Sequence, residues 1–151
     1  MKESRNPSPG QEEGDGQRKL PVTLDAFDIV REALTAVAGN TVRLRQALLA
    51  CDEWIANVVN HSKAKALSFT CRLDGKTLHV CFSDDGIPFD PMQRVGTVAE
   101  FDALDLGGMG LALIRECAAD ITYERVNEQN ILRLRFDLDD VETQKKEDSA
   151  K

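Results

Sequence analysis

The sequence has 151 residues, which sets an expectation of one domain and leaves no room for a separate sensor or transducer domain. Its 42% hydrophobic and 30% charged residues are typical of a globular protein. A net charge of −7 lacks the basic surplus of a nucleic-acid-binding protein, and no apolar run approaches the ~20 residues of a membrane helix or resembles a signal peptide. We expect a cytoplasmic protein without a nucleic-acid or membrane partner.

Both ends of the chain are predicted to be disordered tails. Residues 1–19 contain two prolines and three glycines among mixed charges, so they cannot bury enough apolar surface to offset the entropy of ordering. Residues 139–151 form an acidic C-terminal tail with few apolar side chains. The folded domain is therefore expected to span residues 20–138.

Two helices are predicted first. One follows candidate N-caps at Thr23 and Asp25 and ends near Gly39, with apolar residues at steps of three and four. The next begins at Thr41 and extends to about Asn60. Its apolar stripe alternates steps of four and three (Leu44, Leu48, Cys51, Ile55 and Val58).

A β-hairpin is predicted over residues 67–83, where two alternating runs meet at Asp74-Gly75. A two-residue loop at this dipeptide would pair Leu73 with Lys76 and place Phe69 opposite Val80. In that register the apolar side chains of both strands share one face of the sheet.

The remaining body contains an irregular segment over residues 84–108, a short helix from Met109 to about Ala119, and two strands over residues 121–126 and 131–138 with a turn over 127–130. Paired strands and clustered helices predict an α+β fold, a two-layer sandwich with a mostly antiparallel sheet and helices on one face.

The four cysteines, Cys51, Cys71, Cys81 and Cys117, stand singly in apolar runs, with no CxxC pair and no histidine at metal-ligand spacing. We interpret them as reduced core residues.

The first group of candidate functional residues is on the second helix. Glu53, Asn57 and His61 stand at i, i+4 and i+8, so their side chains follow one ridge. The plainer interpretation is a solvated polar face. For His61 in particular, capping of the helix C-terminus is favoured over a ligand role.

Two glycine-containing motifs follow. Asp84-Asp85-Gly86 stands at the exit of a strand, where such a sequence is by itself usually a turn. Gly107-Gly108-Met109-Gly110-Leu111 leads into a helix, whose free N–H groups and positive dipole end suit a phosphate. It is neither a P-loop nor a GxGxxG motif.

Taken together, these motifs resemble an ATP-binding fold, that of the histidine-kinase-like ATPase (GHKL) superfamily. Glu53-x-x-x-Asn57-x-x-x-His61, Asp84-x-Gly86 followed by Phe89-Asp90-Pro91, and Gly108-Met109-Gly110-Leu111 look like its asparagine box and two glycine boxes. Within the superfamily, the DDGIPFDP and GGMGLALI segments most resemble the bacterial anti-sigma factor serine kinases of the RsbW and SpoIIAB type.

The resemblance implies ATP and Mg²⁺ as cofactors and assigns site residues. Asn57 would bind Mg²⁺ and ATP, Asp84 would accept from the adenine amino group, and Gly86 would allow the base to approach. Glu53 would be the catalytic residue that orients or deprotonates the attacking hydroxyl. The segment from about Pro91 to Leu106 would be the ATP lid, and four residues would form the phosphate cradle (Gly108, Met109, Gly110 and Leu111).

Two departures from the superfamily pattern are present. Pro88 stands where the broader first glycine box has a second glycine. No Lys or Arg adjoins the glycines of the second box, so phosphate charge would be met by Mg²⁺, backbone N–H groups and Arg94.

The function implied by the resemblance is that of an ATP-dependent serine/threonine kinase. It would phosphorylate an anti-anti-sigma protein with a STAS domain, sequester a sigma factor and form a homodimer. A nucleotide-gated binding module without phosphoryl transfer is the alternative. A histidine kinase is less favoured, because the only histidines are His61 and His79 and no upstream helical hairpin presents a phosphoacceptor.

Overall fold

The computed structural model describes residues 17–88 and 106–138, with the backbone alone for residues 106–111. The elements are, in chain order, β1 (Arg18–Leu20), α2 (Ala26–Ala38), α3 (Val42–Asn57), β2 (Leu67–Asp74), β3 (Thr77–Asp84), α6 (Leu106–Cys117), β4 (Asp120–Val126) and β5 (Gln129–Asp137). From α2 onward this is the order expected from the sequence, whereas β1 was not predicted. A π-helical turn (Val58–Ser62) continues α3. No helix among the described residues is long and apolar enough to cross a membrane.

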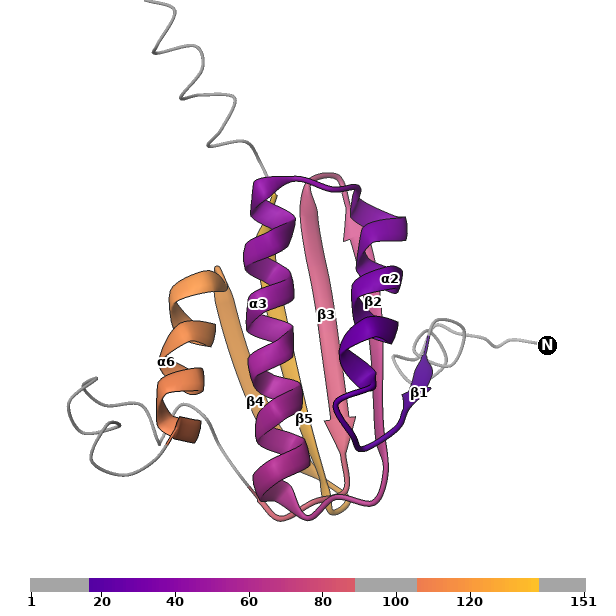
Figure 1. The fold of residues 1–151 in the computed structure, drawn as a ribbon, viewed down its shortest axis with the longest axis vertical. Helices are drawn as coiled ribbons and strands as arrows, with labels where there is room; N and C mark the ends of the chain where they lie inside the picture. The colour runs from indigo at the N-terminus through magenta and orange to yellow at the C-terminus, as the bar shows by residue number, and fades with distance from the viewer. Residues whose placement is uncertain (1–16, 89–105, 139–151) are drawn as a thin grey trace, which may run out of the picture.

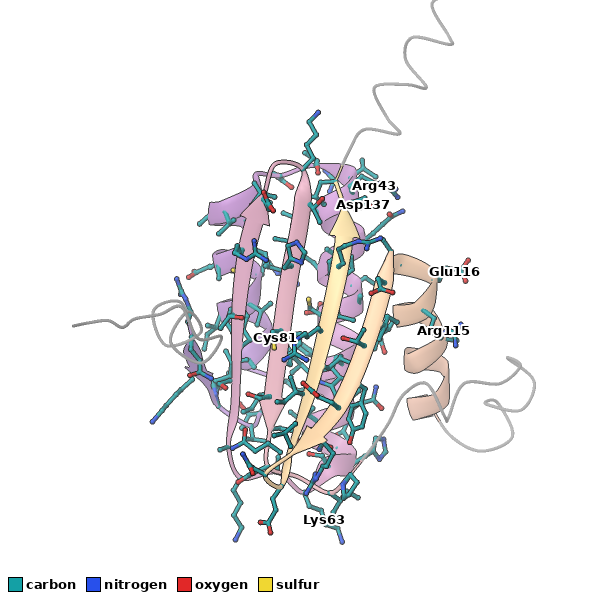
Figure 2. The ribbon with its side chains drawn as sticks, turned by 180° about the vertical axis from the view of Figure 1, so that it is seen from behind. Arg43, Lys63, Cys81, Arg115, Glu116 and Asp137 are labelled. Atoms are coloured by element: carbon teal, nitrogen blue, oxygen red, sulfur yellow. The ribbon has the colours of Figure 1, made fainter. Side chains whose placement is uncertain are left out.

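The fold is a two-layer α+β sandwich. The five strands form an antiparallel sheet in the order β1-β2-β3-β5-β4, and the three helices cover one of its faces, as expected (Figure 1). The other face, seen in Figure 2, is not covered by any helix of the described residues. The sequence predicted Arg18 and Lys19 as part of the disordered N-terminal tail. They instead belong to strand β1, because their backbone pairs with Phe69 and Ser68 of β2.

The core lies between the helices and the sheet. Alternate residues of β3 and β5 are buried, which is the two-residue period of a sheet with one covered face. Phe69 and Phe82 pair across β2 and β3 and stack with ring centroids 5.9 Å apart. The other large side chains that are fully buried come from all three helices and from the two strands β3 and β5 (Trp54, Val30, Leu34, Leu44, Ile55, Ile114, Leu78, Leu132 and Leu134).

The helix boundaries follow local chemistry. The Thr41 side chain accepts a hydrogen bond from the Leu44 N–H at 3.1 Å and caps α3. Gly39 ends α2 with a φ of 83°, a backbone conformation that glycine adopts at little cost.

The predicted register of the β2–β3 hairpin is wrong by two residues. Asp74 pairs with Thr77 and Phe69 with Phe82, so the loop is Gly75-Lys76 and not Asp74-Gly75. Gly75 has a φ of +65° and Lys76 has no positive φ, which fits a turn that needs glycine only at its first central position. Because the sheet period is two, the shift leaves every side chain on its expected face, and it places Asp84 on the covered face in line with Phe82.

All four cysteines are free, as expected, but they are not all core residues. Cys51 is fully buried, and Cys71 and Cys117 are partly buried against the core. Cys81 instead faces the open side of the sheet (Figure 2), because the alternation of β3 directs odd-numbered positions away from the helices.

Candidate functional site

Three predicted motifs come together at one end of the sandwich. The C-terminal ends of α3 and β3 and the β4–β5 turn meet there, and the N-terminal end of α6 points the same way (Figure 1). The contact between the first two is direct, because the Ile87 N–H donates to the Ser62 carbonyl oxygen at 2.8 Å. Residues far apart in the sequence therefore line a single edge of the fold.

Asn57 occupies the last residue of the α-helical part of α3. Its side chain is 3% exposed, and its Nδ2 donates to the Glu53 carbonyl oxygen at 2.9 Å. Since a carbonyl oxygen can only accept, this bond fixes the nitrogen toward the helix and leaves Oδ1 pointing away from it. The Oδ1 atom is buried and has no hydrogen-bond partner among the described residues.

An unpartnered buried amide oxygen costs free energy unless a ligand meets it. Amide oxygen is a hard donor of the kind that Mg²⁺ accepts, so Asn57 fits the predicted metal role. The described residues contain no cluster of three or more His, Cys, Asp or Glu that could hold a metal. An ion at Asn57 would therefore take its other ligands from phosphate oxygens and water, which is how Mg²⁺ usually binds in nucleotide sites.

The sequence predicted that the helix carrying Asn57 extends to about Asn60, but its α-helical part ends at Asn57. It widens into the π-helical turn, whose last residue, Ser62, is buried and donates through Oγ to the Val58 carbonyl oxygen at 2.8 Å. Such turns are rare and often lie at functional sites. His61, on this turn, is exposed.

Glu53 lies one helical turn before Asn57 and is partly buried. The i, i+4 spacing places both side chains on the same side of α3, as expected. Its neighbour Asp52 instead forms an ion pair with Arg31 of α2 at 3.5 Å. Of the two adjacent acids, Glu53 is thus the one with no ion pair among the described residues.

Asp84 is the last residue of β3 and is 2% exposed. Its Oδ1 accepts from the Gly86 N–H at 2.8 Å and from Asn130 Nδ2 at 3.0 Å, whereas no described residue donates to Oδ2. Burial raises the pKa of this carboxyl, and the two hydrogen bonds partly counteract that effect. The site therefore holds a carboxylate with one oxygen anchored and the other uncommitted.

Asp85 next to it has a structural role. Its Oδ1 accepts from the backbone N–H groups of Lys65 and Ala66 at 2.8 and 3.0 Å, and these bonds lower the pKa of the carboxyl. The loop after β3 is in this way attached to the chain that enters β2.

Gly86 is buried against the π-helical turn. A Cβ at this position would lie 2.4 Å from the Ser62 carbonyl oxygen and 2.6 Å from its Cβ and Oγ. The sequence predicted that Gly86 lets a base approach, and that role stays a prediction. The structure supplies a different reason for glycine, which is the close packing of the loop on the end of the helix.

Gly86→Ala is therefore expected to destabilise the fold by about 2–4 kcal/mol, since the contacting atoms include backbone that cannot move aside cheaply. The free energy of unfolding in urea measures the effect. Gly75→Ala is the matched control, because Gly75 has a φ of +65° but open space around it, and we expect it to cost only about 1–2 kcal/mol. Equal losses in both variants would contradict the packing role of Gly86.

The second glycine motif lies inside a helix. The sequence predicted a start at Met109, but α6 begins at Leu106, so Gly108, Met109, Gly110 and Leu111 are its third to sixth residues. Although glycine is a poor helix former, α6 packs beside α3 and buries Ile114, which outweighs that preference. The free N–H groups of a helix belong to its first four residues, and these include Gly108 and Met109.

Other predicted features lie outside the described residues. These are Phe89-Asp90-Pro91, Arg94, the lid up to residue 105, residues 1–16 of the N-terminal tail and the whole C-terminal tail. Two hollows are present in the described part. One, of about 470 Å³, is on the open sheet face, away from the motif cluster, and the other, of about 290 Å³, lies beside β1 and is lined in part by Asp84 and Asp85 of the first glycine motif.

One site residue was missed by the sequence interpretation. Asn130 was assigned to the turn before the last strand, but it is the second residue of β5 and is 1% exposed. Its Nδ2 contacts Asp84, 46 positions earlier. An asparagine beside a turn is ordinary, so the only available signal was its place at the start of an alternating strand, in line with Leu132 and Leu134.

Known proteins resemble this chain in sequence and in fold. The sequence matches the histidine kinase-like ATPase domain over residues 20–136. No curated protein matches it. Among solved structures it is similar to the blue-light activated histidine kinase of Erythrobacter litoralis EL346 (15% identity, TM-score 0.50, 79% of this chain) and to histidine kinase AdeS of Acinetobacter baumannii (14% identity, TM-score 0.49, 82% of this chain).

The chain spans 42% of the first of these proteins and 68% of the second. At such low identity the likeness to the first concerns the fold alone. The family match has a different weight, because it covers the whole sandwich from the end of β1 almost to the end of β5. On that match, the chain belongs to the histidine kinase-like ATPase domain family and is an ATP-binding protein.

Proposed function

We propose that this protein is an ATP- and Mg²⁺-dependent serine/threonine kinase of the anti-sigma type. Its substrate would be a serine on a STAS-type anti-anti-sigma protein, and when not so engaged it would sequester a sigma factor or a similar regulator, with a homodimer as the working unit. The observation that carries the nucleotide part is that two uncommitted acceptors, Asn57 Oδ1 and Asp84 Oδ2, are on elements that end at the same end of the sandwich. The partners rest on the sequence resemblance.

Each residue has a defined task in this proposal. Asn57 would hold Mg²⁺ through Oδ1, and the bound ion would neutralise phosphate charge. Asp84 would accept from the adenine amino group through Oδ2. Glu53, partly exposed and one turn from Asn57, would orient the serine hydroxyl and accept its proton.

Glu53→Ala is expected to lower phosphoryl transfer by about 100-fold or more, because a positioned general base contributes on that scale. Nucleotide affinity should change little, since Asn57 and Asp84 remain. Transfer of label from [γ-³²P]ATP to a STAS-domain protein and calorimetric titration with Mg²⁺-ATP measure the two quantities. Glu32→Ala, which removes an exposed acid of α2, is the control. Transfer by the Glu53 variant at the wild-type rate would contradict the assignment.

The same assay separates the alternatives. A nucleotide-gated binding module, which the absence of Lys or Arg beside the second glycine motif favours, would bind Mg²⁺-ATP without transferring label. Acid-stable label on the partner supports a serine phosphoester, whereas acid-labile label would indicate phosphohistidine. No binding of Mg²⁺-ATP at all would contradict the proposal at its first step.

A further inference from the structure

Asn130 is at the centre of a buried polar network that none of the sequence motifs includes. Its Nδ2 donates to Asp84 Oδ1 at 3.0 Å and to the Ile87 carbonyl oxygen at 2.8 Å. Its Oδ1 accepts from Arg125 Nη1 at 3.1 Å and from the Tyr123 hydroxyl. With four partners and 1% exposure, the amide is fully satisfied.

These partners fix the orientation of the amide. Asp84 Oδ1, when ionised, and the Ile87 carbonyl oxygen can only accept, so they must face the nitrogen. Arg125 can only donate, so it must face the oxygen, and the Tyr123 hydroxyl donates on the same side. In a flipped amide, the oxygen would face the two acceptors, Asp84 Oδ1 and the Ile87 carbonyl oxygen, and the nitrogen would face the donor groups of Arg125 and Tyr123. The β4–β5 hairpin thus presents a donor, and never an acceptor, to Asp84.

The same hairpin holds the loop that follows Asp84. Arg125 Nη1 donates to the Gly86 carbonyl oxygen at 2.6 Å, and Asn130 holds Ile87, the next residue. Asp84 Oδ1 is therefore engaged by two donors, Gly86 N–H and Asn130 Nδ2, while Oδ2 has no partner among the described residues. The carboxylate is locked with one particular oxygen available to a ligand.

The charge state of Asp84 depends on this environment. Burial raises the pKa of its carboxyl, and Asp85, which follows it in the chain, acts in the same direction. The hydrogen bonds from Asn130 and Gly86 and the positive charge of Arg125 on β4 lower that pKa again. The π-helical turn, which packs against the loop, contributes uncharged Ser62 at the contact.

We propose that Asn130, oriented by Tyr123 and Arg125, is a positioning residue that sets the base specificity of the nucleotide site. It keeps Asp84 a pure hydrogen-bond acceptor, so that the site takes a purine with a 6-amino group and rejects one with a 6-oxo group. This inference rests on the proposed nucleotide site at Asp84.

The chemistry of the two bases explains the discrimination. Adenine places a 6-amino donor at the position where hypoxanthine places a carbonyl acceptor. An ionised Asp84 matches the first and repels the second, but a protonated Asp84 could donate to the 6-oxo group. Loss of the Asn130 donor favours the protonated form, so the preference for adenine should disappear at a higher pH than in the wild type.

The test is calorimetric titration with Mg²⁺-ATP and Mg²⁺-ITP from about pH 5 to about pH 8. In the wild type at neutral pH we expect ATP to bind about 10–100-fold more tightly than ITP, the range of one matched against one opposed polar contact. Asn130→Ala should reduce this ratio of affinities about tenfold. The preference for ATP should also begin to weaken at a higher pH in this variant than in the wild type. Asn130→Asp, of the same shape but with an acceptor and a negative charge facing Asp84, should have a larger effect.

Tyr123→Phe tests the network without removing the amide, in case the Asn130 variants do not fold. It deletes one of the two donors that orient Asn130, so we expect a shift in the same direction but smaller. Thr122→Ala, an exposed position of β4 on the open sheet face, should leave both the ratio and its pH profile unchanged.

The outcomes separate the two proposals. A wild type that binds neither nucleotide overturns the proposed function, and the inference fails with it. A wild type that prefers ATP, with Asn130→Ala, Asn130→Asp and Tyr123→Phe variants that keep both the ratio and the pH profile, overturns the inference and leaves the nucleotide site standing. A purely structural role for Asn130 would weaken both nucleotides equally and would not move the pH profile.

Discussion

Asn57→Ala is expected to abolish Mg²⁺-dependent ATP binding while leaving the stability of the protein close to that of the wild type. The loss of binding follows if Oδ1 is the protein ligand of the ion, and we expect an affinity at least 100-fold lower, in line with the loss of a charge-assisted ligand contact. Calorimetric titration with ATP, with and without Mg²⁺, measures it. The variant in Mg²⁺ should behave like the wild type in EDTA.

The expected stability of this variant has a separate physical reason. In the free protein the buried Oδ1 has no partner among the described residues, and its desolvation is not compensated. Alanine removes that acceptor together with the single bond from Nδ2 to the Glu53 carbonyl oxygen, so the two effects oppose each other. Thermal unfolding without ligand measures the net result.

The matched control is Asn60→Ala, which removes an exposed amide three residues further along the same helical segment. It should change neither binding nor unfolding. An Asn57 variant that lost stability and kept its Mg²⁺-dependent affinity would show that the amide serves the fold. It would also remove the main support for the metal site.

The helices and strands could be predicted because their signals are local. Thr41 caps α3 through its own neighbour Leu44, and the alternation of Leu132, Leu134 and Phe136 defines β5. The hairpin register was missed because Asp74-Gly75 and Gly75-Lys76 are both acceptable loops, and the choice depends on pairing along the whole of β2 and β3. The prediction of which side chains face the helices was still correct, since a register error of two residues leaves each side chain on the same face of the sheet.

The candidate site was also predictable only where its signals are local. Asn57, Asp84 and Gly86 could be proposed from spacing within short motifs. Their contacts in the fold could not be predicted, because the contact of Gly86 with Ser62 and that of Asp84 with Asn130 join segments far apart in the chain. Asn130 in particular was interpreted as a turn residue, since asparagine beside Asn127 and Glu128 has the composition of a turn.

The stability of the Asp84 site should depend on pH in a defined direction. A carboxyl whose pKa is raised in the folded state stabilises the fold below its unfolded pKa, and this contribution is lost as the pH rises through the folded pKa. Asp84→Asn does not titrate, so its stability relative to the wild type should be greatest at neutral pH and should decline on acidification. Asp85→Asn should show the opposite sign, since the pKa of Asp85 is lowered and its stabilising effect is lost as the pH falls.

Asp84→Asn is also expected to reverse the choice of base. The two donors on Oδ1, Gly86 N–H and Asn130 Nδ2, would oblige the new amide to keep its oxygen toward them, so its nitrogen would take the place of Oδ2. The site would then offer a donor to the base. We expect ATP affinity to fall and the ITP-to-ATP ratio of affinities to rise by about 100-fold or more. The reason is that the new donor would face the 6-amino donor of adenine, whereas it would match the 6-oxo acceptor of hypoxanthine.

Titration with both nucleotides at neutral pH measures this reversal, with Asp85→Asn as the control that changes the adjacent carboxylate and should retain the preference for ATP. An Asp84 variant that still prefers ATP would mean that adenine is read elsewhere in the site. A variant that loses both nucleotides equally would mean that the carboxylate supports the pocket without contacting the base. Only a reversal of the base preference would indicate that one oxygen of Asp84 is held by Gly86 and Asn130 while the other contacts the purine.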